Sequence, residues 1–253
     1  MTAPVAILSA MDQEIRMVED RLDRPETHEL CGRSYTTGRL PGVDVVTAIS
    51  GYGKVAAAAT TACVIQEFEV AAVIFGGVAG GIRPGVSIGD IVVADHLIQH
   101  DFDASPIFER YVIPSLGLAE IPTDPELTAQ IISAAELYVS TRSADEIGDI
   151  PGRVDASAIK IHRGLITSGD RFISNLAEAA TLQGELPEVL AVEMEGAAVA
   201  QVCAERKTPF AVFRLISDRS DHDAATDFIA FVSTVAAPLT AGIAEEWANA
   251  LSE

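Results

Sequence analysis

Positive charge is scarce in this chain. Its 253 residues include 17 lysines and arginines, of which only three are lysines, against 37 aspartates and glutamates, and the formal net charge is −20. A surface of this sign repels phosphate backbones and anionic lipids, which argues against nucleic-acid or membrane binding driven by charge. No apolar run is long enough to span a bilayer. Aromatic residues are also few, at 6%, so the core is expected to be mainly aliphatic.

Cysteine is scarce as well. Cys31, Cys63 and Cys203 are odd in number and include no C-x-x-C pair. This argues against a disulfide framework or a cysteine-based zinc site and favours a reducing cytoplasm. Cys63 and Cys203 lie in apolar, helix-like runs, where we expect them to be small core residues. Residues 1–4 place no basic region ahead of the first apolar run, so they do not resemble a signal peptide. We therefore expect a cytoplasmic protein.

Strand-like and helix-like segments alternate along the chain. Strands are expected at Val5–Ser9, Val43–Ile49, Ala71–Phe75, Asp90–Gln99, Ile159–Thr167, Val189–Val192 and Phe210–Ile216. Helices are expected after the first strand and at Val55–Phe68, Ser174–Leu182, Glu195–Glu205 and Asp227–Leu251, with a surface helix at Glu126–Ser140 in the otherwise irregular region 101–155. The alternation predicts an α/β fold with a mainly parallel sheet covered on both faces. Without a repeat or linker, residues 1–253 are expected to form one domain.

Two glycine-rich segments, Gly51–Lys54 and Gly76–Gly81, follow strands but match no common nucleotide motif. Val78 replaces a glycine of the dinucleotide fingerprint, and Val55 stands where a P-loop needs serine or threonine. The segments can be plain tight turns, or a backbone wall that a flat base or sugar approaches closely.

Histidine and serine offer little support for other chemistry. His96 and His100 lie in a strand-like run, and the segment 221–223 (Asp-His-Asp) is typical of an exposed acidic loop, so a metal site is a minority interpretation. No G-x-S-x-G elbow occurs, and no serine has an evident histidine partner. We expect neither a metal nor an organic cofactor.

Three carboxylates follow strand-like runs: Glu14, Glu195 and Asp218. Each alone can be a first-turn or capping residue of a helix. Because the carboxyl ends of parallel strands meet at one edge of a sheet, the three can also share a pocket. Cleaving an N-glycosidic bond needs an acid for the leaving base, a base for water and groups that hold the sugar as positive charge develops. Three carboxylates supply these roles.

The order of these motifs resembles the purine nucleoside phosphorylase and nucleosidase superfamily, and within it most closely the 5'-methylthioadenosine/S-adenosylhomocysteine nucleosidases. The resemblance covers almost the whole chain and is weakest at 105–155. Its segments are Ser9–Glu14, Ser50–Val55, Gly76–Gly81, Gly89–Val93, Ser168–Ile173, Val192–Glu195 and Ser217–Asp218. It implies a three-layer α/β/α sandwich with a mixed, mainly parallel sheet. It also implies a hydrolase that releases adenine from 5'-methylthioadenosine, S-adenosylhomocysteine or 5'-deoxyadenosine.

The same resemblance implies a role for each site residue. Glu14 would activate the attacking water, Glu195 would bind the ribose hydroxyls, and Asp218 would protonate N7 of the purine. The expected substrate-binding residues contact the sugar (Met194), the adenine (Phe172, Ile173), the 5' substituent (Phe228), the protonating carboxyl (Ser217) and the walls of the site (Val78, Ala79, Gly80, Tyr52). A homodimer is implied too, in which the neighbour's Asp101–Phe108 segment closes the 5' pocket.

Two departures from the family pattern favour water over phosphate as the nucleophile. Val78 replaces a hydroxyl residue, and Phe75 stands where hexameric phosphorylases carry an arginine. Arg83 and Arg214 are the cations that could still reach the pocket. Tyr52 is bulkier than the usual aliphatic residue, which allows an unusual 5' substituent. The alternatives are a phosphorylase, a nucleosidase for another modified nucleoside such as aminodeoxyfutalosine, and a nucleoside-binding or storage protein of the same fold.

Overall fold

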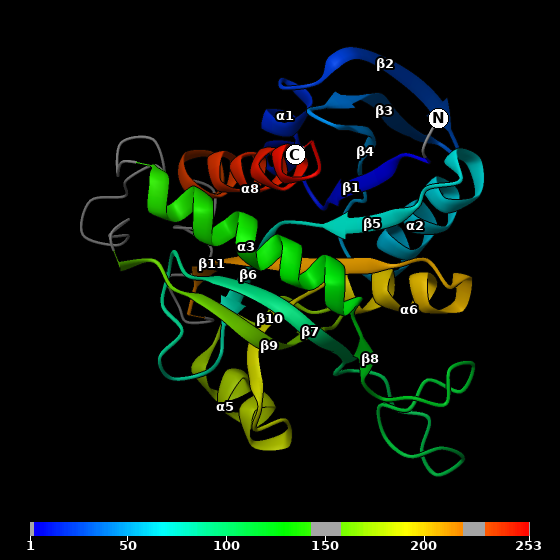
Figure 1. Ribbon diagram of the computed structural model, residues 1–253. Coiled ribbons are helices and arrows are strands. Elements are labelled where there is room, and N and C mark those ends of the chain that lie inside the picture. Colours follow the sequence, from blue (N-terminus) through cyan, green and yellow to red (C-terminus); the bar gives the residue numbers. More distant parts are fainter. Residues whose placement is uncertain (1–2, 143–157, 220–230, 253) are drawn as a thin grey trace.

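The computed structural model describes residues 3–142, 158–219 and 231–252 (Figure 1). Within these ranges no helix is long and apolar enough to cross a membrane. The α/β fold predicted from the sequence is confirmed, with helices on both faces of a mixed sheet.

The sheet has eleven described strands in the spatial order β2-β3-β4-β1-β5-β11-β6-β10-β9-β7-β8. Six of the strand pairings are parallel and five are antiparallel. Strand β11 also pairs with β7, so the half formed by β11, β6, β10, β9 and β7 curls back on itself. In chain order the strands are β1 (Val5–Ser9), β2 (Asp23–Leu30), β3 (Arg33–Leu40), β4 (Val43–Ile49), β5 (Ala72–Phe75), β6 (Val78–Gly81), β7 (Ile91–Gln99), β8 (Ile121–Pro122), β9 (Ile161–Ser168), β10 (Val189–Glu193) and β11 (Phe210–Asp218).

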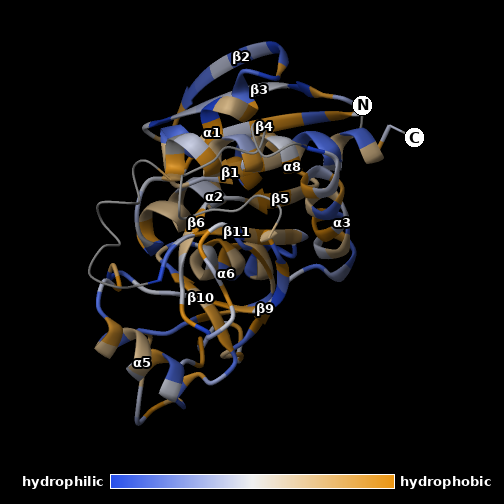
Figure 2. Cartoon of the chain, turned by 90° about the vertical axis from the view of Figure 1, so that its left-hand side faces the viewer, coloured by the Kyte–Doolittle hydropathy of each residue, from blue (hydrophilic) through white to orange (hydrophobic). Residues whose placement is uncertain are grey.

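The helices form two outer layers and one separate end piece (Figures 1 and 2). Helices α1, α3 and α8 pack together on one face, α2 packs with α6 on the other, and α5 lies at the end of the molecule beyond β10. Side-chain caps fix the starts of two of them, because Asp124 accepts the Leu127 N–H of α3 and Asn175 accepts the Glu178 N–H of α5. The described helices are α1 (Asp12–Glu19), α2 (Lys54–Phe68), α3 (Pro125–Thr141), α5 (Leu176–Glu185), α6 (Gly196–Arg206) and α8 (Ala237–Ala250), which a π-helical turn, Val232–Ala236, precedes.

Alternation along the central strands divides the core between these layers. In β1, Val5 and Ile7 belong to the hydrophobic cluster that α1, α3 and α8 cover. Ala6 and Leu8 point the other way and join the cluster beneath α2 and α6. In Figure 2 the central strands carry hydrophobic colours, whereas the outer strand β2, exposed along most of its length, is largely hydrophilic. Strands buried on both faces are mainly apolar along their length, and the carboxyl ends of the central strands hold the candidate site.

Candidate active site

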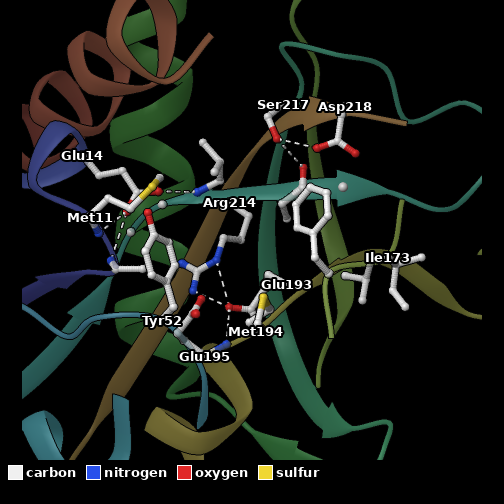
Figure 3. A pocket seen from close by; sticks show the side chains of 18 of the residues that line it. Met11, Glu14, Tyr52, Ile173, Glu193, Met194, Glu195, Arg214, Ser217 and Asp218 are labelled. Carbon is white, nitrogen blue, oxygen red and sulfur yellow. Dashed lines mark hydrogen bonds and ion pairs between the residues drawn. The ribbon is translucent and has the colours of Figure 1, made fainter. Parts of the chain in front are cut away.

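One pocket gathers the predicted site residues at the carboxyl ends of the central strands (Figure 3). Its empty volume is about 620 Å³ when the open mouth is included. Every predicted site residue that the structure describes lines it. Phe228 lies outside the described residues. The lining residues are Ala10, Met11, Glu14, Tyr52, Gly76, Gly77, Val78, Ala79, Gly80, Arg171, Phe172, Ile173, Val192, Glu193, Met194, Glu195, Arg214, Ser217 and Asp218.

Glu14 lies in the first turn of α1, and backbone N–H groups hold its buried carboxylate. Its Oε2 accepts the N–H groups of Ala10 and Met11 at 3.0 and 2.9 Å, and Oε1 accepts that of Val78 at 3.0 Å. A Cβ at Gly77 would stand 2.9 Å from Oε1, so glycine is needed for this approach. Burial raises the pKa of Glu14 to about 7, although Arg214 and the three N–H groups favour the charged form. A carboxyl with this pKa can exchange protons near neutral pH.

Four hydrogen bonds to protein groups hold Arg214 at the pocket. Its Nε and Nη2 donate to Glu193 Oε2 at 3.2 and 2.6 Å, while Nη1 donates to the carbonyl oxygens of Phe75 and Phe213 at 3.1 and 3.0 Å. The guanidinium also lies 4.3 Å from the centre of the Phe75 ring. Both members of the ion pair are buried. Phe75 therefore does more than replace a phosphate-binding arginine, because its ring and carbonyl help to keep Arg214 in place.

Glu195 occupies the position just before α6, where the chain leaves β10. Its Oε1 accepts the N–H of Gly53 at 2.7 Å, which ties the second glycine segment to the pocket. Burial, and then the charge of Glu193, raise the pKa of Glu195 to about 8; the Gly53 bond and Arg214 oppose this shift. At neutral pH the carboxyl can thus both donate and accept hydrogen bonds, which suits a partner that carries adjacent hydroxyl groups.

Ser217 and Asp218 end β11 on the side of the pocket away from Glu14 (Figure 3). The strand register shifts between Ile216 and Asp218 where β11 pairs with β6, and this irregularity places both residues at the pocket wall. Ser217 Oγ donates to Asp218 Oδ2 at 2.8 Å, and the side chain of Asp218 is almost fully buried. Carboxyl groups thus stand on two sides of one cavity, the arrangement needed for an acid at one end of a bound molecule and a base at the other.

The remaining predicted residues form the walls. The backbone of Ala79 and Gly80 belongs to β6 (Val78–Gly81), so most of the glycine-rich segment Gly76–Gly81 is a strand and not a loop. Tyr52 and Phe172 are exposed at the mouth of the pocket, whereas Ile173 is buried. The Val78 side chain is half-buried and packs against the core, and its N–H serves Glu14. The hydroxyl missing at Val78 is therefore not needed to hold Glu14.

Sequence reasoning did not assign roles to Glu193 and Ser168. Glu193 accepts the N–H groups of Glu195 at 3.1 Å and of Gly196 at 2.8 Å in addition to the Arg214 bonds. Ser168 Oγ donates to Glu193 and accepts the Ala197 N–H at 2.7 Å. Together they fix the start of α6, and with it Glu195. The sequence did offer one sign of this pair, because an acid and a hydroxyl residue end the neighbouring strands β10 and β9.

Arg171 is the other arginine at this pocket, and it lies at the rim. Its Nη2 bonds to Glu178 Oε1 at 2.7 Å, and its side chain is largely exposed. Arg83, named from the sequence as a cation that could reach the site, is exposed and does not line the pocket. Among the described residues no group of three or more histidines, cysteines and acids is arranged to hold a metal ion.

Comparisons with known proteins identify the relatives of this chain. The sequence profile of the phosphorylase superfamily matches residues 4–248. The 5'-methylthioadenosine/S-adenosylhomocysteine nucleosidase of Colwellia psychrerythraea is 35% identical over 91% of this chain and 89% of its own length.

Two solved structures extend the comparison. The nucleosidase of the same name from Neisseria meningitidis, in complex with methylthio-immucillin-A, superposes with a TM-score of 0.85 at 33% identity, covering 98% of this chain and 99% of its own. A futalosine hydrolase of Helicobacter pylori superposes with a TM-score of 0.83 at 31% identity over 98% of this chain and 97% of its own. The chain belongs to the phosphorylase superfamily and, within it, to the 5'-methylthioadenosine/S-adenosylhomocysteine nucleosidase family.

Proposed function

We propose that the protein hydrolyses the N-glycosidic bond of 5'-modified adenine nucleosides, giving adenine and the free pentose derivative. The leading substrates are 5'-methylthioadenosine, S-adenosylhomocysteine and 5'-deoxyadenosine. Support comes from the names of relatives matched over nearly the whole chain and from the inhibitor-bound Neisseria structure. It also comes from the carboxyl groups that line one pocket.

Two charged groups beside the glycine segment Gly76–Gly81 favour water over phosphate as the nucleophile. Glu14 presents a carboxyl to the pocket, and the buried cation Arg214 is already paired with Glu193 and two carbonyl oxygens. A phosphate dianion here would be desolvated beside a carboxylate, with no unpaired cation in the described lining to compensate. A neutral water molecule meets no such penalty and can give its proton to Glu14.

We assign the following steps to these groups, in line with the family resemblance. Asp218 protonates the leaving adenine at N7, which makes the base a neutral leaving group. Glu195 binds the ribose hydroxyls, and the carboxylates stabilise the positive charge that develops at the anomeric carbon. Glu14 accepts a proton from the water that attacks this carbon. Met194 packs against the sugar, and Phe172 and Ile173 enclose the adenine.

The first test adds phosphate to the reaction. Adenine release from 5'-methylthioadenosine is expected to proceed at the same rate with and without phosphate, and the sugar product is expected to be the free pentose. Both products are measured by chromatography. Appearance of a sugar 1-phosphate in step with adenine would replace hydrolysis by phosphorolysis, while no adenine release from any adenine nucleoside would favour a binding or storage protein.

Glu195→Ala tests the ribose contact. Because a hydroxyl contact exists in both the bound substrate and the transition state, the variant is expected to raise KM and lower kcat together, with kcat/KM falling roughly 10²-fold or more. Glu120→Gln, at an exposed acid outside the pocket, serves as the matched control and should behave like the parent. An unchanged affinity of the Glu195 variant for ribosides would exclude this role.

A second substrate class deserves a direct comparison. The Helicobacter neighbour is named a futalosine hydrolase, and Tyr52 places a bulky, exposed ring at the pocket mouth. A nucleoside with a larger 5' substituent is therefore the alternative substrate. Ranking kcat/KM across 5'-methylthioadenosine, S-adenosylhomocysteine and aminodeoxyfutalosine decides between the two.

We also propose that the enzyme is a cytoplasmic homodimer. Apolar side chains are exposed near the pocket mouth and in the Asp101–Phe108 segment, with Val55 81% and Ile107 82% accessible. A neighbouring Asp101–Phe108 segment would cover such surface and close the 5' end of the site. Sedimentation is expected to give the dimer mass, and Ile107→Asp is expected to shift it toward the monomer. A parent protein that sediments as a monomer would contradict this assembly.

A further inference from the structure

Two of the three cysteines, neither of which lines the pocket, lie close together. The Sγ atoms of Cys31 and Cys63 lie 2.7 Å apart, although the residues are 32 positions apart in the sequence. Cys31 lies in the turn between β2 and β3, and Cys63 in the third turn of α2. This separation is shorter than an ordinary packing contact between two sulfur atoms and longer than the bond of a disulfide, about 2.05 Å.

Neighbouring contacts fix this approach. Arg33, two residues after Cys31, donates from Nη2 to the carbonyl oxygen of Ala56 at 3.2 Å and from Nε to the hydroxyl of Thr60. Tyr35 is fully buried, and its hydroxyl donates to the carbonyl oxygen of Thr60 at 3.4 Å. These hydrogen bonds hold the hairpin against α2 at Ala56 and Thr60, which precede Cys63 in the helix. The two thiols meet because the fold brings their elements together.

The turn itself is unusual for cysteine. Cys31 has φ = +53° and Gly32 has φ = +72°, the pair of left-handed residues that a two-residue hairpin turn requires. Asparagine, aspartate or glycine is preferred at the first of these positions, and other side chains adopt this conformation only at a cost. A cysteine held there, with its sulfur directed at a second cysteine, points to a role for the thiol.

We propose that Cys31 and Cys63 are a site of reversible disulfide formation by exchange with small-molecule disulfides. Cys31 is exposed and can be reached from solution, Cys63 is buried beneath it, and Cys203 is completely buried. The Cys31 thiolate attacks one sulfur of the small disulfide and releases one thiol. The Cys63 thiolate then attacks the Cys31 sulfur of the mixed disulfide and releases the second thiol. The two cysteines lose two electrons and two protons, and the small disulfide gains them.

The local charges set the conditions for this exchange. The hydrogen bond with Cys63 is the main cause of a raised pKa of Cys31; Glu67 adds to the shift and Arg33 opposes it. The thiolate is the attacking species, so the exchange is run at alkaline pH. The cross-link joins the hairpin to α2, and the N-cap of this helix, Gly53, donates its N–H to Glu195 in the pocket.

The experiment equilibrates the full-length protein with oxidised and reduced glutathione at several ratios, blocks free thiols and maps the peptides without reduction. A peptide pair joined through Cys31 and Cys63 is expected, while Cys203 is expected to be recovered as a free thiol. Closing this loop is expected to raise Tm on the order of 5 °C, and dithiothreitol is expected to reverse the rise.

Cys31→Asn is the matched control, because asparagine suits the left-handed turn and cannot form the bond. The variant is expected to melt near the Tm of the reduced parent protein. Its Tm should not respond to the glutathione ratio. Recovery of Cys31 and Cys63 as separate free thiols at the most oxidising ratio would overturn the proposal, as would glutathione attached to Cys31 with Cys63 still free.

Discussion

Asp218→Asn is expected to lower kcat by roughly 10²-fold or more while the affinity for a non-cleavable nucleoside analogue changes little. Asparagine keeps the size of the side chain at the end of β11 and can still accept the Ser217 hydroxyl through its oxygen. Its amide can donate a hydrogen bond to N7 of a purine, but it cannot transfer the proton that adenine needs to leave. Steady-state kinetics with direct binding of the analogue separates the two effects.

Ser217→Ala provides the comparison for Asp218. It removes the 2.8 Å hydrogen bond that orients the carboxyl but leaves the proton donor in place, so the loss in kcat should be smaller than that of the asparagine variant. Circular dichroism and Tm establish that both variants are folded. Near-parental turnover of the asparagine variant would remove Asp218 from the mechanism, and the acid would then have to be sought elsewhere in the pocket.

The elements that position these residues were predictable because their sequences are locally consistent. The run Val5–Ser9 was expected as a strand and is β1, and the Ala-rich run expected at Val55–Phe68 is α2, one residue longer. Both lie where apolar residues dominate and the period is clear. The hairpin of β2 and β3 was not predicted. Its first strand is polar and exposed, so neither alternation nor hydrophobicity marks it. Pairing with β3 and the contact of the His28 ring with Phe68 of α2 stabilise it, and both are tertiary contacts.

The candidate site likewise has residues that the sequence predicted and residues that it did not. Glu14, Glu195 and Asp218 each follow or end a strand. The rule that parallel strands present their carboxyl ends together allowed a shared pocket, and the resemblance to the nucleosidases favoured it over separate capping roles. The Arg214–Glu193 pair could not be predicted, because the partners are 21 positions apart and meet only through the packing of β10 and β11 around β6. An arginine within an apolar run carries no sign of its partner. The single-domain assignment of residues 1–253 stays a prediction.

Glu14 also makes the reaction depend on pH. Burial raises its pKa to about 7, so the carboxylate that can accept a proton from water is the minor form below this value and the major form above it. The kcat/KM of the parent enzyme is therefore expected to fall about tenfold for each pH unit below about 7, as expected for a single required base. The Glu195 carboxyl, with a pKa of about 8, remains mostly protonated over the same acidic range, so its titration does not explain this limb.

Glu14→Gln is expected to reduce kcat by roughly 10²- to 10⁴-fold and to abolish the acidic limb of the pH profile, because the amide cannot take a proton from water. The carboxylate accepts N–H groups on both oxygens, whereas glutamine has one accepting oxygen, so the variant also loses at least one backbone hydrogen bond and Tm must be measured alongside. Glu14→Asp is the control, since it keeps the base but withdraws it by one methylene, and it should retain more activity than the glutamine variant. Normal hydrolysis by a folded Glu14→Gln protein would show that water is activated elsewhere and would restore the case for a different nucleophile.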